Sequence, residues 1–352
     1  MRVHIMLLID SFRSYLNSTS KSPLFLCGDS LHVLSALPSH SIDCCMTSPP
    51  YWNQREYHNG GIGLEDDYLR YIANLLEVTQ EIFRVLKDSG SFWLNLGDSY
   101  LNKRLLGIPW RIAIEMGEQQ NWIMRNDVIW NKIKGMDTSK DKLRPVHEHL
   151  FHFVKHNRYH YDLDAIRSKP RRAKVKNGAV VSATGVTGVK YKRQIELSTS
   201  LDEKEKVQAE SALSETLRRL ESGEISDFRM VIRKQHRTTH SDSTRVSGRA
   251  KELAEKGFYF LYYHQNGSKP GDVWEILPED TSNRGTHYAV YPEDLCKIPI
   301  LATCPLDGIV LDPFCGSGTT NVVAFQLERK SIGIDISRSY VEQAKERCKI
   351  LL

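Results

Sequence analysis

The 352-residue sequence lacks the long apolar runs of a membrane protein. Its most apolar early stretch, residues 5–9, is ended by Asp10 and followed by Arg13. A spanning helix needs roughly 18 nearly uninterrupted apolar residues, so we expect no membrane helix and no secretory signal. Hydrophobic residues make up 40% of the chain and charged residues 26%, which excludes collagen-like, mucin-like and wholly disordered proteins.

Disulfide and metal-binding motifs are also missing. The seven cysteines are odd in number, lie mostly in apolar runs and include no Cys-x-x-Cys pair, so we expect them to be buried and reduced. The thirteen histidines include the pairs His147/His149 and His156/His160, but these lack cysteine partners and no His-Glu-x-x-His element occurs. We therefore expect no metal site.

Net charge is small, at +5, but its distribution along the chain is uneven. Residues 167–257 contain 21 Lys and Arg against 12 Asp and Glu, whereas the remainder contains 27 against 31. A basic segment of this kind is typical of a surface that binds a polyanion such as nucleic acid. A solvated loop whose charge only maintains solubility is an equally good interpretation of charge alone.

Two parts of the chain, residues 23–166 and 271–352, alternate between strand and helix patterns. The apolar runs predict strands at 24–27, 42–46, 91–96, 127–131, 149–155, 309–311 and 331–334, and the amphipathic stretches predict helices at 30–37, 67–86, 108–116, 294–301, 319–327 and 337–352. This order is typical of a doubly wound α/β sheet. Residues 168–271 differ in texture and contain one predicted helix, 202–220, so we interpret them as an insertion.

A glycine-bearing turn follows the predicted strand 309–311 and opens the next helix. In Asp312-Pro313-Phe314-Cys315-Gly316-Ser317-Gly318-Thr319-Thr320, Gly316 and Gly318 lie where the backbone must turn tightly and a ligand can approach it. Asp335 follows about seventeen residues after Gly318, at the end of the next strand, where a carboxylate meets ribose hydroxyls. The third glycine of a dinucleotide motif and the Gly-Lys-Ser/Thr ending of a P-loop are absent. The pattern therefore indicates a nucleoside cofactor, with a ligand-free tight turn as the alternative.

A rigid polar corner follows the predicted strand 42–46. In Thr47-Ser48-Pro49-Pro50-Tyr51 the two prolines fix two φ angles and remove two amide donors, so the corner presents acceptors. Ser48 and the carbonyl of Pro49 are suited to holding both hydrogens of an amino group, and Tyr51 offers a flat face to a planar ring. We expect Trp52 and Tyr57 to serve stacking rather than core packing. The alternative is a rigid surface turn with an aromatic staple.

Both motifs resemble those of the amino-group DNA methyltransferases of restriction and modification systems, in the circularly permuted arrangement with the catalytic motif first. The segments Cys27-Gly28-Asp29-Ser30, Asn95-Leu96-Gly97-Asp98, His147-Glu148-His149, 162–167 and 287–293 also have counterparts in that family. The resemblance implies a mostly parallel, seven-stranded, Rossmann-like methyltransferase sheet. Its two halves would be residues 1–167, the catalytic half, and 271–352, the cofactor half, separated by a target-recognition insert at 168–270.

The resemblance also implies roles for individual residues. S-adenosylmethionine would be the methyl donor, and no metal would be needed. The expected cofactor-binding residues are Asp29 (adenine), Asp335 (ribose) and, around the methionine and the turn, Asp312, Phe314, Gly316, Ser317, Gly318 and Thr319. The expected catalytic residues are Ser48, Pro49, Pro50 and Tyr51, which would hold a target base rotated out of the duplex.

The identity of the methylated base follows less directly. Methylation of cytosine C5 needs a cysteine nucleophile, which the cytosine-C5 methyltransferases present in a Pro-Cys dipeptide. This chain has only the reverse order, Cys304-Pro305. Ser48 favours cytosine N4, since Asp or Asn at this position usually accompanies adenine N6. Adenine N6 stays an alternative, followed by an RNA or nucleoside methyltransferase and by a non-catalytic binding protein on the same fold.

The expected partner is double-stranded DNA, contacted through the insert. We assign Arg229, Arg233, Lys234 and Arg237, together with residues 169–176, to contacts with the DNA backbone or groove. The family implies a cognate restriction endonuclease as a functional partner and a location in the prokaryotic cytoplasm, close to the nucleoid.

Overall fold

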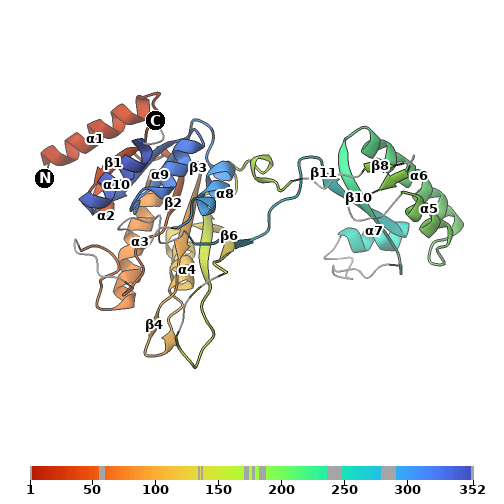
Figure 1. Ribbon diagram of the computed structural model, residues 1–352, viewed down its shortest axis with the longest axis horizontal. Helices are drawn as coiled ribbons and strands as arrows, with labels where there is room; N and C mark the ends of the chain where they lie inside the picture. Colours follow the sequence, from red (N-terminus) through yellow and green to blue (C-terminus); the bar gives the residue numbers. More distant parts are fainter. Residues whose placement is uncertain are drawn as a thin grey trace. The chain divides into compact units, whose positions relative to one another are not determined.

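The computed structural model describes residues 2–54, 60–133, 135, 138–169, 174–176, 179–181, 188–235, 248–278 and 291–349. The chain divides into two compact units (Figure 1). Unit 1 comprises residues 1–165 and 271–352, and unit 2 comprises residues 166–270. None of the described helices is long and apolar enough to cross a membrane.

Unit 1 is built on an eight-stranded sheet with strand order β1-β14-β13-β2-β3-β7-β6-β12. Its strands are β1 (Leu24–Cys27), β2 (Ile42–Thr47), β3 (Leu86–Leu96), β6 (Ile123–Asn131), β7 (His147–Val154), β12 (Val273–Glu275), β13 (Ile309–Asp312) and β14 (Lys330–Asp335). Strand β7 runs antiparallel to both of its neighbours, and the other pairs are parallel. The expected doubly wound, mostly parallel α/β fold is confirmed, but the expected seven strands become eight because β12 pairs with β6 at the sheet edge.

The late strands β13 and β14 lie between the early strands β1 and β2, so both halves of the chain form one sheet. Strand β13 pairs in parallel with β2, with Val310 opposite Cys44 and Leu311 opposite Cys45. The carboxyl ends of β1, β14, β13, β2 and β3 therefore lie along one edge of the sheet, where open α/β sheets bind their ligands.

Helices cover both faces of this sheet (Figure 1). One face packs against α1 (Arg2–Asn17), α2 (Ser30–Ala36), α3 (Tyr68–Val85) and α4 (Ile108–Gln120), and the other against α8 (Glu293–Thr303), α9 (Thr319–Gln326) and α10 (Arg338–Lys349). The strand sequences explain the two layers, because successive side chains point to opposite faces. In β2, Cys45 joins the first core and Cys44 and Met46 join the second.

The boundary between α3 and β3 differs from the expected one. The predicted helix 67–86 ends at Val85, and β3 begins at Leu86 rather than at residue 91. Gly90, which lies between the predicted helix and the predicted strand 91–96, is inside β3, where an added Cβ would lie 3.0 Å from the carbonyl oxygen of Asp43. Glycine therefore permits a close approach of two backbones here.

Helix α1 and one cysteine also depart from expectation. No helix was expected at residues 2–17, yet α1 is joined to β14 through Tyr15, whose hydroxyl donates to the carbonyl of Ser331 at 2.9 Å. Burial raises the pKa of Tyr15 to about 12. Six of the seven cysteines are buried as free thiols, whereas Cys27 is exposed.

Unit 2 has its own hydrophobic core. It contains β8 (Lys174–Lys176), β9 (Ala179–Val181), α5 (Gly188–Glu196), α6 (Glu203–Glu221), β10 (Ile225–Ile232), α7 (Gly248–Lys256) and β11 (Phe258–His264). The predicted helix at 202–220 is confirmed as α6, which Asp202 and Glu205 open with a reciprocal capping box. The antiparallel pair β10 and β11 was not expected, and it packs Phe228, Met230 and Phe258 against the helices.

His152 in β7 makes the stability of unit 1 depend on pH. Its ring stacks on Trp93 with centroids 4.1 Å apart, and burial lowers its pKa from 6.5 to about 3. Between those values the unfolded chain takes up a proton that the folded chain excludes, so stability is complete above pH 6.5 and falls as pH falls. Between pH 7 and pH 5 the free energy of unfolding of the wild type should fall. We expect this fall to be smaller by about 1 to 2 kcal/mol in His152→Phe, measured by urea unfolding.

The exposed His156 provides the control, since the change His156→Phe should leave the wild-type pH dependence in place. If His152→Phe and wild type lost equal stability over this range, the buried imidazole would not be the titrating group.

Candidate active site

The two motifs of the sequence analysis meet at the carboxyl edge of the sheet. Residues 48–51 follow β2, and the glycine turn follows its neighbour β13. The hydroxyl of Thr47, the last residue of β2, donates to Oδ1 of Asp312 at 2.6 Å. This hydrogen bond joins the two motifs directly, although 265 positions separate them in the sequence.

Asp312 is enclosed by this junction. Its carboxylate is 1% exposed and accepts from Thr47 and the Phe314 amide on Oδ1, and from Thr320 (2.6 Å) and Tyr291 (3.1 Å) on Oδ2. Burial raises its pKa, and these donors oppose the rise. The carboxylate therefore fastens the turn to the neighbouring strand and helix. Its expected contact with the methionine part of the cofactor stays a prediction.

The turn after β13 requires its glycines. Gly316 has φ +50° and its amide donates to Oδ2 of Asp335 at 2.9 Å. Gly318 has φ +81° and caps α9, and an added Cβ would lie 2.8 Å from the Cβ of Ala344. Both positions therefore have a left-handed backbone, and at Gly318 a side chain would also obstruct the close approach of α10.

The remaining predicted cofactor residues surround the same turn. Asp335 is half-buried at the end of β14, and burial raises its pKa. Asp29 is exposed after β1 and caps α2 by accepting from the His32 amide at 3.0 Å. Phe314 is half-buried.

Ser317 and Thr319 are buried, and their hydroxyls accept from Arg347 of α10 at 3.1 Å. The structure thus gathers the predicted residues at the ends of three neighbouring strands, while Arg347 has no place in the sequence motif.

The corner after β2 contains a hydrogen-bond network. Ser48 Oγ lies 3.2 Å from the Tyr51 hydroxyl, and Tyr51 donates to Oε2 of Glu148 at 2.7 Å. Asn95 Nδ2 is within hydrogen-bond distance of Ser48 (3.3 Å), Tyr51 (2.9 Å) and Glu148 (2.7 Å). Lys132 also bonds to Glu148. Burial, with the nearby Glu148 charge, holds the pKa of Tyr51 well above its usual value, so the phenol is a hydrogen-bond donor.

Asn95, Glu148 and Lys132 received no role from the sequence, although two of them lie in quoted motifs. The pairing of β3 with β7, in which Leu96 lies opposite His149, brings Asn95 and Glu148 together. The pairing of β6 with β7 adds Lys132, the residue after β6. Asn95 Oδ1 is buried and has no hydrogen-bond partner within the described part of the chain. The network therefore keeps one acceptor available to a donor.

Three features of the corner refine the expectations. Pro50 is fixed through its carbonyl, which accepts from the Tyr71 hydroxyl at 3.0 Å. Trp52 is 4% exposed and belongs to the core, so the expectation that it serves stacking is wrong. Tyr57 lies outside the described residues. The ring of Tyr51 lies on Gly97, where an added Cβ would be 2.7 Å from Cε2 of the ring.

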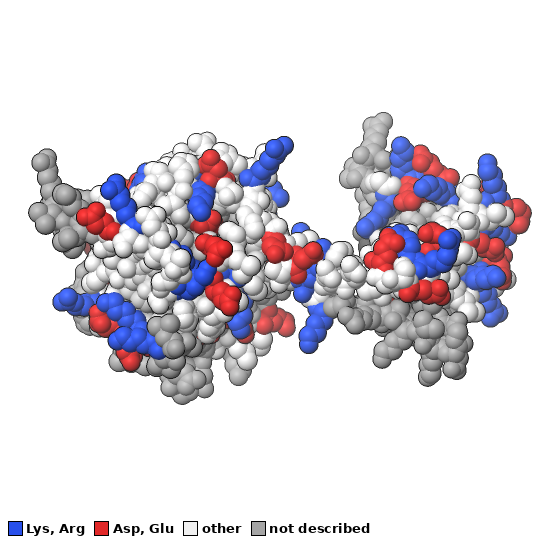
Figure 2. Space-filling view, turned by 90° about the horizontal axis from the view of Figure 1, so that it is seen from above, with Lys and Arg blue, Asp and Glu red and all other residues white. Residues whose placement is uncertain are grey.

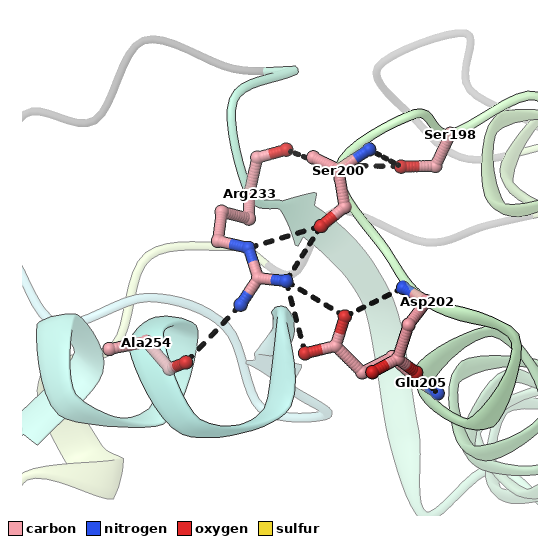
Figure 3. A network of polar contacts seen from close by, with 6 residues as sticks. All are labelled: Ser198, Ser200, Asp202, Glu205, Arg233 and Ala254. Atoms are coloured by element: carbon pink, nitrogen blue, oxygen red, sulfur yellow. Dashed lines mark hydrogen bonds and ion pairs between the residues drawn. The ribbon is translucent and has the colours of Figure 1, made fainter.

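The predicted DNA contacts belong to unit 2. Arg229 on β10 and Lys234 after it are exposed, and Arg237 lies outside the described residues, as do 170–173 of the expected contact segment. Arg233 is held inside the unit (Figure 3). Its guanidinium bonds to Glu205 (2.8 Å) and to the carbonyls of Ser200 (2.6 Å) and Ala254 (3.2 Å). Arg233 therefore has a structural role, and its contact with DNA stays a prediction.

Basic and acidic side chains alternate over the face of unit 2 that Figure 2 shows. The described basic side chains seen on this face are thus interspersed with carboxylates and form no uniform basic patch there. Several basic side chains are paired, as Arg219 with Glu224 at 2.7 Å. Within the described part of the chain, no group of three or more His, Cys, Asp and Glu side chains is arranged to hold a metal ion.

Comparison with known proteins identifies the family. Residues 42–346 match the DNA methylase family of N6 and N4 methyltransferases. The type II methyltransferase M.SfiI of Streptomyces fimbriatus is 31% identical over 89% of this chain and 88% of its own length. M.SmaI of Serratia marcescens is 28% identical over 97% and 95%. The chain belongs to this family and is a DNA methyltransferase of the amino-group class, as its motifs suggested.

A solved structure agrees in fold. The PvuII DNA methyltransferase (cytosine-N4-specific) has a TM-score of 0.56 with 16% identity, over 94% of this chain and 87% of that chain. The Rossmann-like methyltransferase fold is thereby confirmed.

The contact of Tyr51 with Gly97 predicts a sensitive position. Gly97→Ala would push the Tyr51 ring away from β3 and disturb the corner, so we expect DNA methylation to slow by about tenfold to a hundredfold. The initial rate of methyl incorporation into DNA measures this effect. Gly271→Ala is the matched control, because nothing lies within 4 Å of its added Cβ. A wild-type rate in Gly97→Ala would contradict the placement of Tyr51.

Proposed function

We propose that this protein transfers a methyl group from S-adenosylmethionine to the N4 amino group of cytosine at a specific site in duplex DNA. The single observation that supports it most is the Thr47–Asp312 hydrogen bond, which sets the acceptor-rich corner beside the glycine turn. The choice of cytosine N4 rests on Ser48, since the family usually has Asp or Asn at this position when it acts on adenine N6.

The residues of the turn fit the cofactor. Gly316 and Gly318 allow the left-handed backbone that the turn needs, and Asp335 beside them would be the carboxylate for the ribose hydroxyls. Asp29 would border the adenine, and Phe314 would border the methionine. A DNA modification methylase from Thermus thermophilus, solved with S-adenosylmethionine, has a TM-score of 0.50 and 18% identity over 93% of each chain. When bound, the cofactor supplies an activated methyl group on a sulfonium.

The corner residues act on the amino group of the base. The nitrogen lone pair is delocalised into the ring and is a poor nucleophile, so Ser48 Oγ and the Pro49 carbonyl would accept its hydrogens and favour a more tetrahedral nitrogen. Asn95 and Tyr51 keep Ser48 oriented, and Glu148 and Lys132 keep Tyr51 oriented. Prearranged acceptors of this kind stabilise the positive charge that develops on nitrogen. No covalent intermediate with the protein is required.

The target base must leave the duplex to reach this corner, because stacking and pairing hide its amino group. Unit 2 would read the sequence around it, with Arg229, Arg233, Lys234 and Arg237 as the proposed DNA contacts. The relatives carry type II methyltransferase names, so we also propose that a cognate restriction endonuclease cuts the sequence that this protein protects.

The role of Ser48 can be tested by substitution. Ser48→Ala removes one acceptor for the amino group, so we expect methyl transfer to slow by more than about tenfold, while cofactor affinity measured by equilibrium dialysis stays unchanged. Ser35→Ala, which removes an exposed hydroxyl far along α2, is the control. Full activity in Ser48→Ala would rule out the acceptor role.

The base and the site can be determined together. DNA from cells that express this chain is sequenced by a method that distinguishes N4-methylcytosine from N6-methyladenine. We expect N4-methylcytosine at one recurring short sequence, and much less of this modification in cells that express Ser48→Ala. N6-methyladenine at such a sequence would establish the alternative base, and unmodified DNA would contradict the proposed function.

A further inference from the structure

A basic surface lies on unit 1, which contains the candidate active site, and is distinct from the proposed DNA contacts in unit 2. It consists of the hairpin at 99–106, with β4 (Tyr100–Leu101) and β5 (Arg104–Leu105), and the described residues 138–146 of the loop between β6 and β7. We call these two segments the basic arm. Its charged residues are Lys103, Arg104, Lys140, Lys142 and Arg144 against the single acid Asp141, and all six are exposed.

The arm extends from the edge of the sheet that carries the catalytic corner. The hairpin follows the carboxyl end of β3, and the second loop follows the carboxyl end of β6 (Figure 1). Strand β2 pairs in parallel with β3, and β7 runs antiparallel to both β3 and β6. The ends of β2, β3 and β6 therefore share one edge.

The hairpin is anchored to the residue that follows the corner. Ser99 Oγ donates to the carbonyl of Trp52 at 3.0 Å, and the carbonyl of Ser99 accepts from the Leu106 amide at 3.0 Å. The carboxylate of Asp98 accepts from the amides of Gly107 (2.9 Å) and Ile108 (3.1 Å), which closes the base of the hairpin. The arm is thus a fixed extension of the active-site edge.

The two segments of the arm also contact each other. Lys103 pairs with Asp141 at 2.7 Å, and Lys142 Nζ lies 4.8 Å from the centre of the Tyr100 ring. Because Lys103 neutralises the only acid among these described residues, the arm keeps a net positive charge. Three leucines are exposed between the charges: Leu101 at 42%, Leu105 at 52% and Leu143 at 92%.

An extruded base stays attached to its sugar and phosphates, so the DNA backbone must lie close to the corner at residues 47–51. We propose that the basic arm binds the sugar-phosphate backbone of duplex DNA beside the target base. The inference rests on the proposed function. Its support is the charge complementarity of the arm to phosphate and the attachment of its hairpin to the residue after Tyr51. The catalytic unit would then hold DNA independently of sequence, leaving sequence reading to unit 2.

The salt dependence of DNA binding tests this proposal. The triple variant Arg104→Gln/Lys140→Gln/Lys142→Gln removes three charges without touching the catalytic network. Each lost phosphate contact lowers the slope of log affinity against log salt by about 0.9, so we expect the slope to fall by about 2 to 3. The probe is a fluorescent duplex of mixed sequence, and anisotropy is measured with the full chain between about 50 and 200 mM salt.

The control is Lys297→Gln/Lys345→Gln/Lys349→Gln, which removes the same charge from α8 and α10 and should keep the wild-type slope. The single variant Arg104→Gln, expected to lower the slope by about 1, serves if the triple variant folds poorly. A wild-type slope in the arm variants would overturn the inference and leave the proposed function intact. Failure of the wild-type chain to bind duplex DNA at all would instead contradict the proposed function.

Discussion

The hydrogen bond between Thr47 and Asp312 is the contact on which the site depends. It fixes the end of β2 to the end of β13, and with them the acceptor-rich corner to the glycine turn. Burying a carboxylate costs several kcal/mol unless hydrogen bonds compensate it. Donors from Thr47, Phe314, Thr320 and Tyr291 provide that compensation, and they come from β2, the turn itself, α9 and the segment just before α8. The same group therefore stabilises the fold and aligns the two halves of the site.

The corner shows a second level of organisation. Ser48 and Tyr51 come from one short segment, but Asn95, Lys132 and Glu148 come from β3, from the end of β6 and from β7. The acceptor role proposed for Ser48 needs a defined orientation of its hydroxyl, and a surface loop alone would leave that hydroxyl free to rotate. The neighbouring strands restrict it, which is the pre-organisation that electrostatic stabilisation of a transition state requires.

Sequence patterns correctly predicted those features of the structure that depend on neighbouring residues in the chain. The strands around 42–46 and 309–311, the helix at 202–220 and the placement of Gly316, Gly318 and Asp335 all follow from apolar runs, helical patterns and turn chemistry within a few residues. Contacts between segments that are distant in the sequence could not be predicted from such local patterns. Asn95 and Glu148 meet through the β3–β7 register, Trp52 is drawn into the core, and Arg233 bonds to Glu205 across unit 2. The β10–β11 pair was missed because Asp227 and Arg229 interrupt the apolar run of β10, whose buried side chains pack with α5 and α6.

The central claim is that the corner and the turn border one cofactor, and photolabelling tests it most directly. The full chain is irradiated with ultraviolet light in the presence of S-adenosylmethionine labelled in its methyl group, and the labelled peptides are mapped. We predict label in peptides that contain residues 47–51 or 312–320, and its loss when unlabelled cofactor is in excess. Label confined to residues 188–235 or 248–270 of unit 2, or no specific label, would contradict the account.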